Sequence, residues 1–174
     1  MKTQGTDSTP RRSSEGFTLT EVMMVTFIFG LIMTASMGIY TTASREWKDT
    51  DITLNTSHDA NMIMERIVYG YGVNMGLRSI EKLSVGQSSS SAGWALRYEN
   101  PGAGTNYLQY SKALRQISYN NTSMGSTWAV IGNNVTSSAI TNTGDGLSVA
   151  LTVERKEGKF SSQSSLTTFA LFRN

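Results

Sequence analysis

The sequence predicts an α+β fold, in which one long N-terminal helix is followed by an antiparallel β-sheet. An uncharged apolar stretch from Val22 to Ser44 indicates the first part of the helix. Helical spacing of apolar residues then continues to about Val68 without an intervening proline. After Gly93, short segments of alternating apolar and polar residues are separated by glycine-containing turns, which is typical of antiparallel strands.

The composition limits both the size and the partners of the protein. Its 174 residues suit one domain with one modest core. The 15 basic and 13 acidic residues give a net charge of +2, so the chain has no strong field to attract nucleic acid or another polyanion. Since it has no cysteine, disulfides, thiolate zinc sites and cysteine nucleophiles are excluded, and the redox compartment stays open.

The N-terminal segment has the charge pattern of a membrane protein. The polar stretch 1–16 contains the basic residues Lys2, Arg11 and Arg12. As a helix that rises about 1.5 Å per residue, residues 22–40 span roughly 28 Å, close to the thickness of the hydrocarbon core of a bilayer. The basic residues before this span predict that the N-terminus lies in the cytoplasm and that the C-terminal part lies outside.

An ordinary secretory signal also combines basic residues with an apolar run. Thr34-Ala35-Ser36 offers small residues at which a signal peptidase can cut. Two features argue against this alternative. The apolar run is longer than the core of a usual signal, and Glu21 lies at its cytoplasmic edge, where a signal peptide gains nothing from a carboxylate. A protein with a simple single membrane span is a further alternative.

The residues at this edge resemble a known processing signal. The run Gly16-Phe17-Thr18-Leu19-Thr20-Glu21, preceded by Arg11-Arg12 and followed by an uncharged helix, resembles the class III leader of type IV prepilins and type II secretion pseudopilins. Thr20 departs from that family, which usually has a bulky aliphatic residue there. The resemblance implies that prepilin peptidase cuts after Gly16, methylates the new N-terminus at Phe17 and leaves the apolar helix as the core of a filament. It also implies that Glu21 is the fifth residue of the mature chain.

Glu21 is expected to be an assembly residue. An ionised carboxylate at the edge of the hydrocarbon is costly unless a cation compensates it. Cleavage creates such a cation, the ammonium of Phe17, which can pair with Glu21 of a neighbouring subunit and set the axial register between helices. A second interpretation needs no partner: Glu21 stabilises the N-terminus of its own helix through the macrodipole, by about 0.3–1 kcal/mol.

Residues 41–69 are predicted to form the amphipathic half of the same helix, beyond the membrane-spanning part at 17–40. Apolar and uncharged residues recur at three- and four-residue spacing along it: Tyr40, Ala43, Trp47, Thr50, Leu54, Ala60, Met64, Ile67 and Tyr71. Trp47 and the Met62/Met64 pair are interpreted as core residues. Gly70 and Gly72 are expected to end the helix, whose apolar face needs a sheet to cover it.

Residues 70–92 are predicted to be a connecting loop with a short element at 77–83, and residues 93–174 to form the sheet. A hairpin is predicted from Trp94-Leu96-Tyr98, a turn at Pro101-Gly102-Ala103-Gly104, and Tyr107 to Tyr110. Further strands are expected at Leu114–Tyr119, Thr127–Ile131, Asn134–Thr141, Leu147–Val153 and Leu166–Phe172. The glycine-containing stretches 144–146 and 156–159 form the turns around the Leu147–Val153 strand.

A second resemblance concerns the C-terminal half. The run Asn133-Asn134-Val135-Thr136, the Leu147–Val153 strand and the ending Leu171-Phe172-Arg173-Asn174 resemble minor pseudopilins of the J-like group of type II secretion. Many major pilins have a cysteine pair, which this sequence lacks. Together the two resemblances imply a pilin-like fold and a minor pilin or pseudopilin.

The sequence offers little for catalysis or for a bound cofactor. His58 is the only histidine, and it has no evident second metal ligand or nucleophile. Asp49 and Asp51 are two positions apart on a helix and therefore point to different sides. Related pseudopilins bind calcium in C-terminal loops, but Asn142 and Asp145 supply one carboxylate only, so a plain hairpin tip is the simpler interpretation. We therefore expect no enzyme, cofactor or metal site.

The resemblance implies a structural function in a filament. The expected partners are prepilin peptidase, other pilins or pseudopilins, the inner-membrane assembly platform and, before assembly, membrane lipid. The expected location is the inner membrane, with a single pass, a cytoplasmic N-terminus and a periplasmic C-terminal domain, and then the filament. The alternative is a secreted or membrane-tethered β-rich binding module that an ordinary signal sequence exports. Whether the filament is a secretion pseudopilus, a pilus or a competence fibre stays open.

Overall fold

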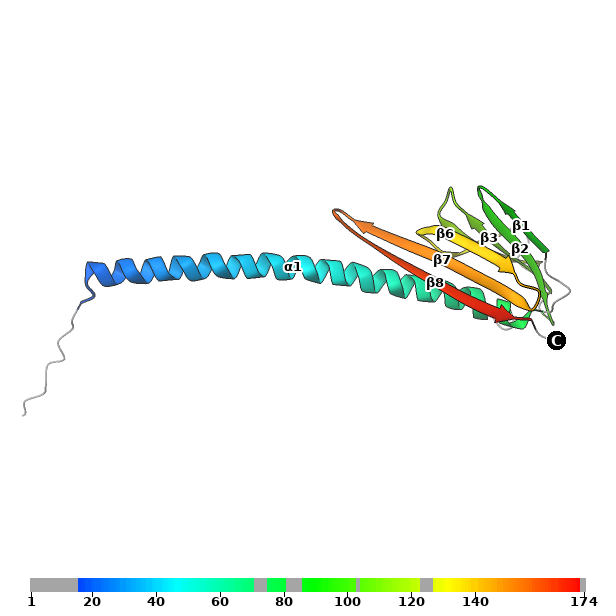
Figure 1. Cartoon of the computed structure of the whole chain (residues 1–174), viewed down its shortest axis with the longest axis horizontal. Helices are drawn as coiled ribbons and strands as arrows, with labels where there is room; N and C mark the ends of the chain where they lie inside the picture. The colour runs from blue at the N-terminus through cyan, green and yellow to red at the C-terminus, as the bar shows by residue number, and fades with distance from the viewer. Residues whose placement is uncertain (1–15, 71–74, 81–85, 103, 123–126, 173–174) are drawn as a thin grey trace, which may run out of the picture. The chain divides into compact units, whose positions relative to one another are not determined.

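The computed structural model describes residues 16–70, 75–80, 86–102, 104–122 and 127–172. In these ranges one long helix is followed by a short 3-10 helix and eight strands, which confirms the predicted α+β architecture (Figure 1). The chain divides into two compact units, Met1–Ser44 and Arg45–Asn174. Several predicted features lie outside the described residues, namely positions 1–15 of the leader, Tyr71, Gly72 and Arg173-Asn174.

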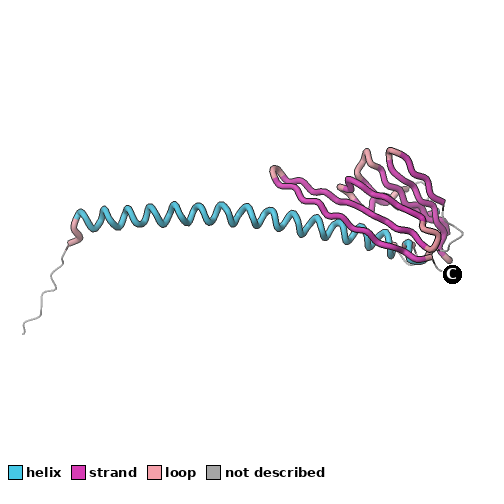
Figure 2. Tube along the Cα trace, in the orientation of Figure 1, coloured by secondary structure: helices cyan, strands magenta, loops and turns pink. Residues whose placement is uncertain are grey.

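The helix α1 runs without interruption from Leu19 to Tyr69, as predicted (Figure 2). In the first unit, every described residue is exposed. Gly70 ends the helix with a φ of 88°, a left-handed conformation that glycine adopts without strain. Its N–H donates to the carbonyl of Arg66 at 2.9 Å, which satisfies one of the terminal carbonyls of the helix.

Only the last part of α1 contributes to the core. Its buried residues are Ile52, Thr56, Ala60, Ile63, Met64 and Ile67. The prediction that Ala60, Met64 and Ile67 share a buried face is therefore confirmed. The interpretation of Trp47 and Met62 as core residues was wrong, since Trp47 is 80% exposed and Met62 is also exposed.

The burial of α1 begins where the sheet begins to cover it. The turn at 157–160 lines a shallow hollow together with Lys48 and Ile52, so Ile52 is the first helix residue that the strands cover. Trp47 comes more than one helical turn earlier. Periodicity predicts which residues share a face of a helix, but the length of the sheet decides how many of them are buried.

The larger sheet has five antiparallel strands in the order β1-β2-β3-β4-β5. Their bounds are β1 Gly86–Ser90, β2 Gly93–Asn100, β3 Gly104–Ser111, β4 Gln116–Asn121 and β5 Ala129–Gly132. The predicted hairpin is confirmed as β2 and β3, in which Leu96 pairs with Leu108. In the predicted loop, the 3-10 helix η1, Leu77–Ser79, lies within the short element predicted at 77–83. The strand β1 was not predicted, because the stretch is rich in serine and glycine.

The smaller sheet has three antiparallel strands in the order β6-β7-β8. Their bounds are β6 Val135–Asn142, β7 Gly146–Glu157 and β8 Phe160–Leu171. The alternating residues Leu147, Val149, Leu151 and Val153 of β7 are all buried, as predicted. Two expectations need correction: the strands form two sheets instead of one, and β8 begins at Phe160 instead of Leu166.

Side chains and a backbone hydrogen bond, instead of a backbone ladder, join the two sheets. The N–H of Val135, at the start of β6, donates to the carbonyl of Arg115, next to β4, at 2.9 Å. Gln87 Nε2 of β1 donates to the carbonyl of Ile140 at 2.9 Å, and the hydroxyl of Tyr110 in β3 donates to the carbonyl of Thr136 at 3.0 Å. Trp94 Nε1 of β2 lies 3.2 Å from the hydroxyl oxygen of Ser138. The inner faces of both sheets and the last turns of α1 thus enclose one apolar core.

Candidate functional site

The N-terminus of α1 is closed by a reciprocal pair of hydrogen bonds between Thr18 and Glu21. The backbone N–H of Thr18 donates to Glu21 Oε2 at 2.9 Å, and the backbone N–H of Glu21 donates to Thr18 Oγ1 at 3.3 Å. The hydroxyl of Thr18 also donates to Glu21 Oε2 at 2.8 Å. Because Leu19 is the first helical residue, this is a capping box with Thr18 at the N-cap and Glu21 at the third helical position.

The capping box leaves part of the carboxylate accessible. All three hydrogen bonds of the box join Thr18 and Glu21, and in the described chain the bonds to the carboxylate reach Oε2 only. Glu21 is exposed, so Oε1 faces the surroundings and can accept from an outside cation. The carboxylate therefore has a local structural role and a free oxygen at the same time.

Gly16 and Phe17 lie before the capping box, outside the helix. Neither belongs to a helix or strand, both are exposed, and Phe17 is 85% exposed. A Cβ added at Gly16 would meet nothing within 4 Å. Both residues are therefore accessible in the described chain, and the predicted site residues Gly16, Phe17 and Glu21 lie within one short segment.

The first unit presents an extensive apolar surface. α1 contains a stretch that is long and apolar enough to cross a membrane, and none of that stretch is buried within the chain. The exposed large apolar residues there are Phe17, Leu19, Val22, Met23, Met24, Val25, Phe27, Ile28, Phe29, Leu31, Ile32, Met33, Met37, Ile39 and Tyr40. A surface of this extent needs lipid or other apolar helices around it, because water alone does not solvate it favourably.

Three threonines in this apolar stretch form hydrogen bonds within their own helix. The hydroxyls of Thr26, Thr34 and Thr42 donate to backbone carbonyls of the preceding turn, at 2.8–3.1 Å. Threonine can therefore lie in hydrocarbon without an unpaired donor. At Gly30 and Gly38 an added Cβ would meet nothing within 4 Å, so both positions are open to close approach by another helix.

The residues that were considered for catalysis or calcium lie on α1 and in a turn between strands. His58, Asp49 and Asp51 are exposed on α1, and the described residues contain no group of three or more His, Asp or Glu that could hold a metal ion. Asn142 Oδ1 accepts from the N–H of Gly144 at 2.9 Å, which is the bonding of a turn.

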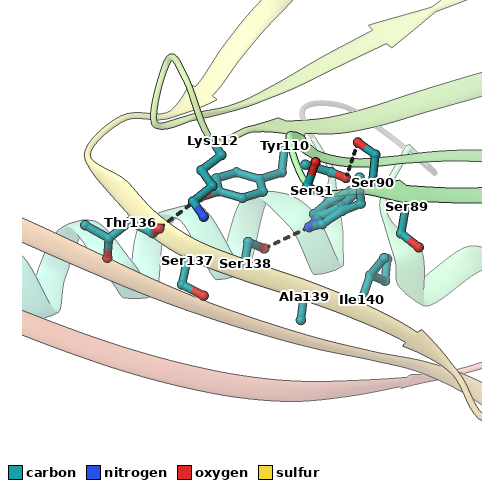
Figure 3. Close-up of a pocket in the computed structure, with 12 residues that line it drawn as sticks. Ser89, Ser90, Ser91, Tyr110, Lys112, Thr136, Ser137, Ser138, Ala139 and Ile140 are labelled. Atoms are coloured by element: carbon teal, nitrogen blue, oxygen red, sulfur yellow. Dashed lines mark hydrogen bonds between the residues drawn. The ribbon is translucent and has the colours of Figure 1, made fainter.

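A polar cleft of about 420 Å³ lies between β6 and the β1-β2-β3 part of the larger sheet (Figure 3). Hydroxyl groups line it, from Ser89, Ser90, Ser91, Thr136, Ser137 and Ser138, together with the ammonium of Lys112. Trp94 and Tyr110 form its aromatic wall, and their polar atoms are already bonded to β6. None of the described residues that line the cleft is a carboxylate or histidine, so the cleft has no pair for acid–base chemistry.

Sequence reasoning missed two features of the site. The capping role of Thr18 was overlooked, although the spacing Thr-x-x-Glu at the start of an apolar helix is a known signal for it. The cleft carries no such signal, because its residues come from separate strands that meet only in the folded chain.

One family model matches the chain. Residues 11–37 match the prokaryotic N-terminal methylation motif, which covers Gly16, Phe17, the capping box and most of the exposed apolar stretch. No curated protein and no solved structure matches the chain. The match therefore concerns the N-terminal segment, and the β-sheets are described by their own geometry alone.

Proposed function

We propose that this chain is a type IV pilin-like subunit that is cleaved between Gly16 and Phe17, methylated at Phe17 and assembled into a filament through α1. The observation that supports the proposal is the match of residues 11–37 to the N-terminal methylation motif, on a helix whose membrane-length apolar stretch is not buried within the chain. Such a helix lies in lipid before assembly and among sister helices afterwards, since both environments cover apolar surface.

In this proposal the charge of Glu21 aligns one subunit with the next. The new ammonium of Phe17 pairs with Glu21 Oε1 of a neighbouring subunit, while Oε2 keeps its bonds to Thr18. The pair is favourable because both charges leave water together, whereas either charge alone would be costly in an apolar surrounding. The capping box holds the carboxylate in one orientation before the partner arrives.

The remaining parts of the proposal concern location and partners. The chain spans the inner membrane once, with its N-terminus in the cytoplasm and the unit that contains the sheets in the periplasm. Its partners are prepilin peptidase, other pilins or pseudopilins and the inner-membrane assembly platform. The role of a minor subunit, of the J-like pseudopilin type, is the most specific part of the proposal and depends on the resemblance of the C-terminal half.

Mass spectrometry of the mature N-terminus tests the processing step. An N-methylated Phe17 supports the proposal. A chain that keeps residues 1–16 refutes it. A chain that begins at or after Ser36 supports the alternative of an exported binding module, in which the polar cleft would hold the ligand.

Three variants separate the two roles of Glu21. Glu21→Gln keeps an acceptor for the capping box but removes the charge, whereas Thr18→Ala removes the cap, at a cost of about 1 kcal/mol, and keeps the charge. If the charge pair directs assembly, Glu21→Gln is cleaved normally but fails to enter filaments, and Thr18→Ala enters them. The reverse result assigns Glu21 to capping alone. Glu46→Gln, an exposed carboxylate later on α1, is the matched control.

A further inference from the structure

We propose that β8 is an interface strand, beside which a neighbouring filament subunit adds an extended segment and so continues the three-stranded sheet. The identity of the partner as another subunit rests on the proposed function. The site itself rests on the open edge of β8.

One side of the β8 backbone has no partner strand in the described chain. The N–H of Phe172 donates to the carbonyl of Asp145 at 3.0 Å. Phe172 and Asp145 are therefore a hydrogen-bonded pair, and such pairs alternate with non-bonded pairs along an antiparallel ladder. It follows that the even-numbered residues of β8 direct their N–H and C=O groups to β7. The odd-numbered residues direct theirs outward: Ser161, Gln163, Ser165, Thr167, Phe169 and Leu171. No hydrogen bond between described residues reaches the backbone of these six.

The other edge strands of the two sheets are short, or side chains bind to their free backbone groups. Proteins commonly prevent unwanted strand pairing in these two ways. The side chains of Gln87 and Tyr110 occupy carbonyls of β6. β5 has 4 residues and a register shift beside it, and Arg66 Nη1 donates to its Ile131 carbonyl at 3.2 Å. β1 has 5 residues.

β8 has none of these protections. It is 12 residues long, pairs with β7 without a register shift, and contains no charged residue, proline or glycine. Its outer side chains include Phe169 and Leu171, which are 49% and 65% exposed. At about 3.3 Å per residue, the edge offers roughly 40 Å of unpaired backbone, which is a ready template for strand addition.

The direction of β8 argues against an antiparallel pair of β8 strands from two copies. The turn that precedes β8 lines a hollow with Lys48 and Ile52 of α1. The strand also contacts η1, and Gly76, the residue before η1, packs against Gly70 at the end of α1. β8 therefore runs in the same direction as the second part of α1. Two copies whose helices leave one membrane in the same direction cannot place their β8 strands antiparallel.

The occupant that fits is a different segment of the neighbouring subunit, as expected for the head-to-tail contacts of a helical filament. Its side chains should be uncharged, because an unpaired charge would be placed beside an uncharged strand. They should be apolar where they lie beside Phe169 and Leu171, and bear hydroxyl or amide groups beside Gln163.

Hydrogen exchange on the full-length chain, in detergent and in the assembled filament, tests the proposal at single residues. The even-numbered amides of β8 should be protected in both forms. The odd-numbered amides from Ser161 to Leu171 should exchange at least about tenfold more slowly in the filament, because only strand addition gives them acceptors. Odd-numbered amides that exchange equally fast in both forms would overturn the proposal, as would a crosslink that joins two β8 strands in the filament.

A proline variant provides the second test. Thr167→Pro removes an outward N–H but no bond to β7, so the domain should keep its melting temperature while incorporation into filaments falls about tenfold. Thr167→Val, which keeps the N–H, is the control and should assemble normally. If the proline variant fails to fold, Phe169→Lys places a charge on the same edge and should show the same loss. Normal assembly of a folded edge variant refutes strand addition, whereas failure of the wild-type chain to assemble refutes the proposed function itself.

Discussion

The packing of α1 against β5 depends on a glycine, and this contact allows a quantitative test of the fold. A Cβ added at Gly132 would lie 2.7 Å from both Cδ1 and Cγ1 of Ile63 and 2.9 Å from its Cγ2. Ile63 is 4% exposed, and the new methyl group would meet both branches of its side chain. Gly132→Ala should therefore destabilise the domain by overpacking, at about 2 kcal/mol.

The reciprocal change should remove the clash. Ile63→Ala deletes the side-chain atoms that the new methyl group would meet, and it costs about 3 kcal/mol through lost apolar burial and the remaining cavity. Independent effects would add to about 5 kcal/mol in the double variant. We expect the double variant to lose about 3 kcal/mol of stability instead, because the methyl group added at position 132 fills part of the cavity that Ile63→Ala leaves. The difference from additivity is a coupling energy of about 2 kcal/mol.

Thermal unfolding of the full chain in a mild detergent, followed by near-ultraviolet circular dichroism, measures these changes. For a domain of this size, each kcal/mol lowers the melting temperature by about 3 °C. Additive effects of the two substitutions, or a Gly132→Ala variant as stable as the wild type, would show that α1 does not pack on β5 at this point.

Two further substitutions test the core and the junction between the sheets. Tyr98→Phe removes a hydroxyl that donates to the carbonyl of Met75 at 2.6 Å, and the loss of this partly buried hydrogen bond should cost about 1 kcal/mol in denaturant unfolding. Glu154 accepts from Lys156 at 2.9 Å and from Arg115 at 3.0 Å, and these cations, Lys156 first, lower the pKa of the carboxyl below its ordinary value of 4.5. A carboxyl whose pKa is lowered in the folded state stabilises the fold at any pH above its ordinary pKa, and this stabilisation is lost as the pH falls through the folded-state pKa. Glu154→Gln should therefore be less stable than the wild type near neutral pH and equally stable in acid.

Matched controls accompany both substitutions. Tyr107→Phe, at a half-buried tyrosine of β3, should leave the unfolding free energy nearly unchanged. Glu65→Gln, at an exposed carboxylate of α1, should show little dependence on pH. A pH-independent difference between the wild type and Glu154→Gln would mean that the charge of Glu154 does not stabilise the junction.

Local signals in the sequence determined the N-terminal half of this protein. The start of α1 follows from Thr18 and Glu21, its end from Gly70, and its apolar surface from an uncharged stretch, because each of these depends on residues within a few positions of one another. The resemblance of the N-terminal segment to the methylation motif was readable for the same reason. Alternation alone was enough to identify the buried face of β7.

The tertiary structure decided everything that depends on distant contacts. Trp47 and Ile52 both suit an amphipathic helix, but only Ile52 lies where the strands cover α1. The pairing of Gly86–Ser90 with β2 turned a serine-rich loop into a strand, and the division into two sheets left the 12 residues of β8 with an open edge. Strand pairing and burial are set by which segments meet in space, so residues near in sequence do not specify them.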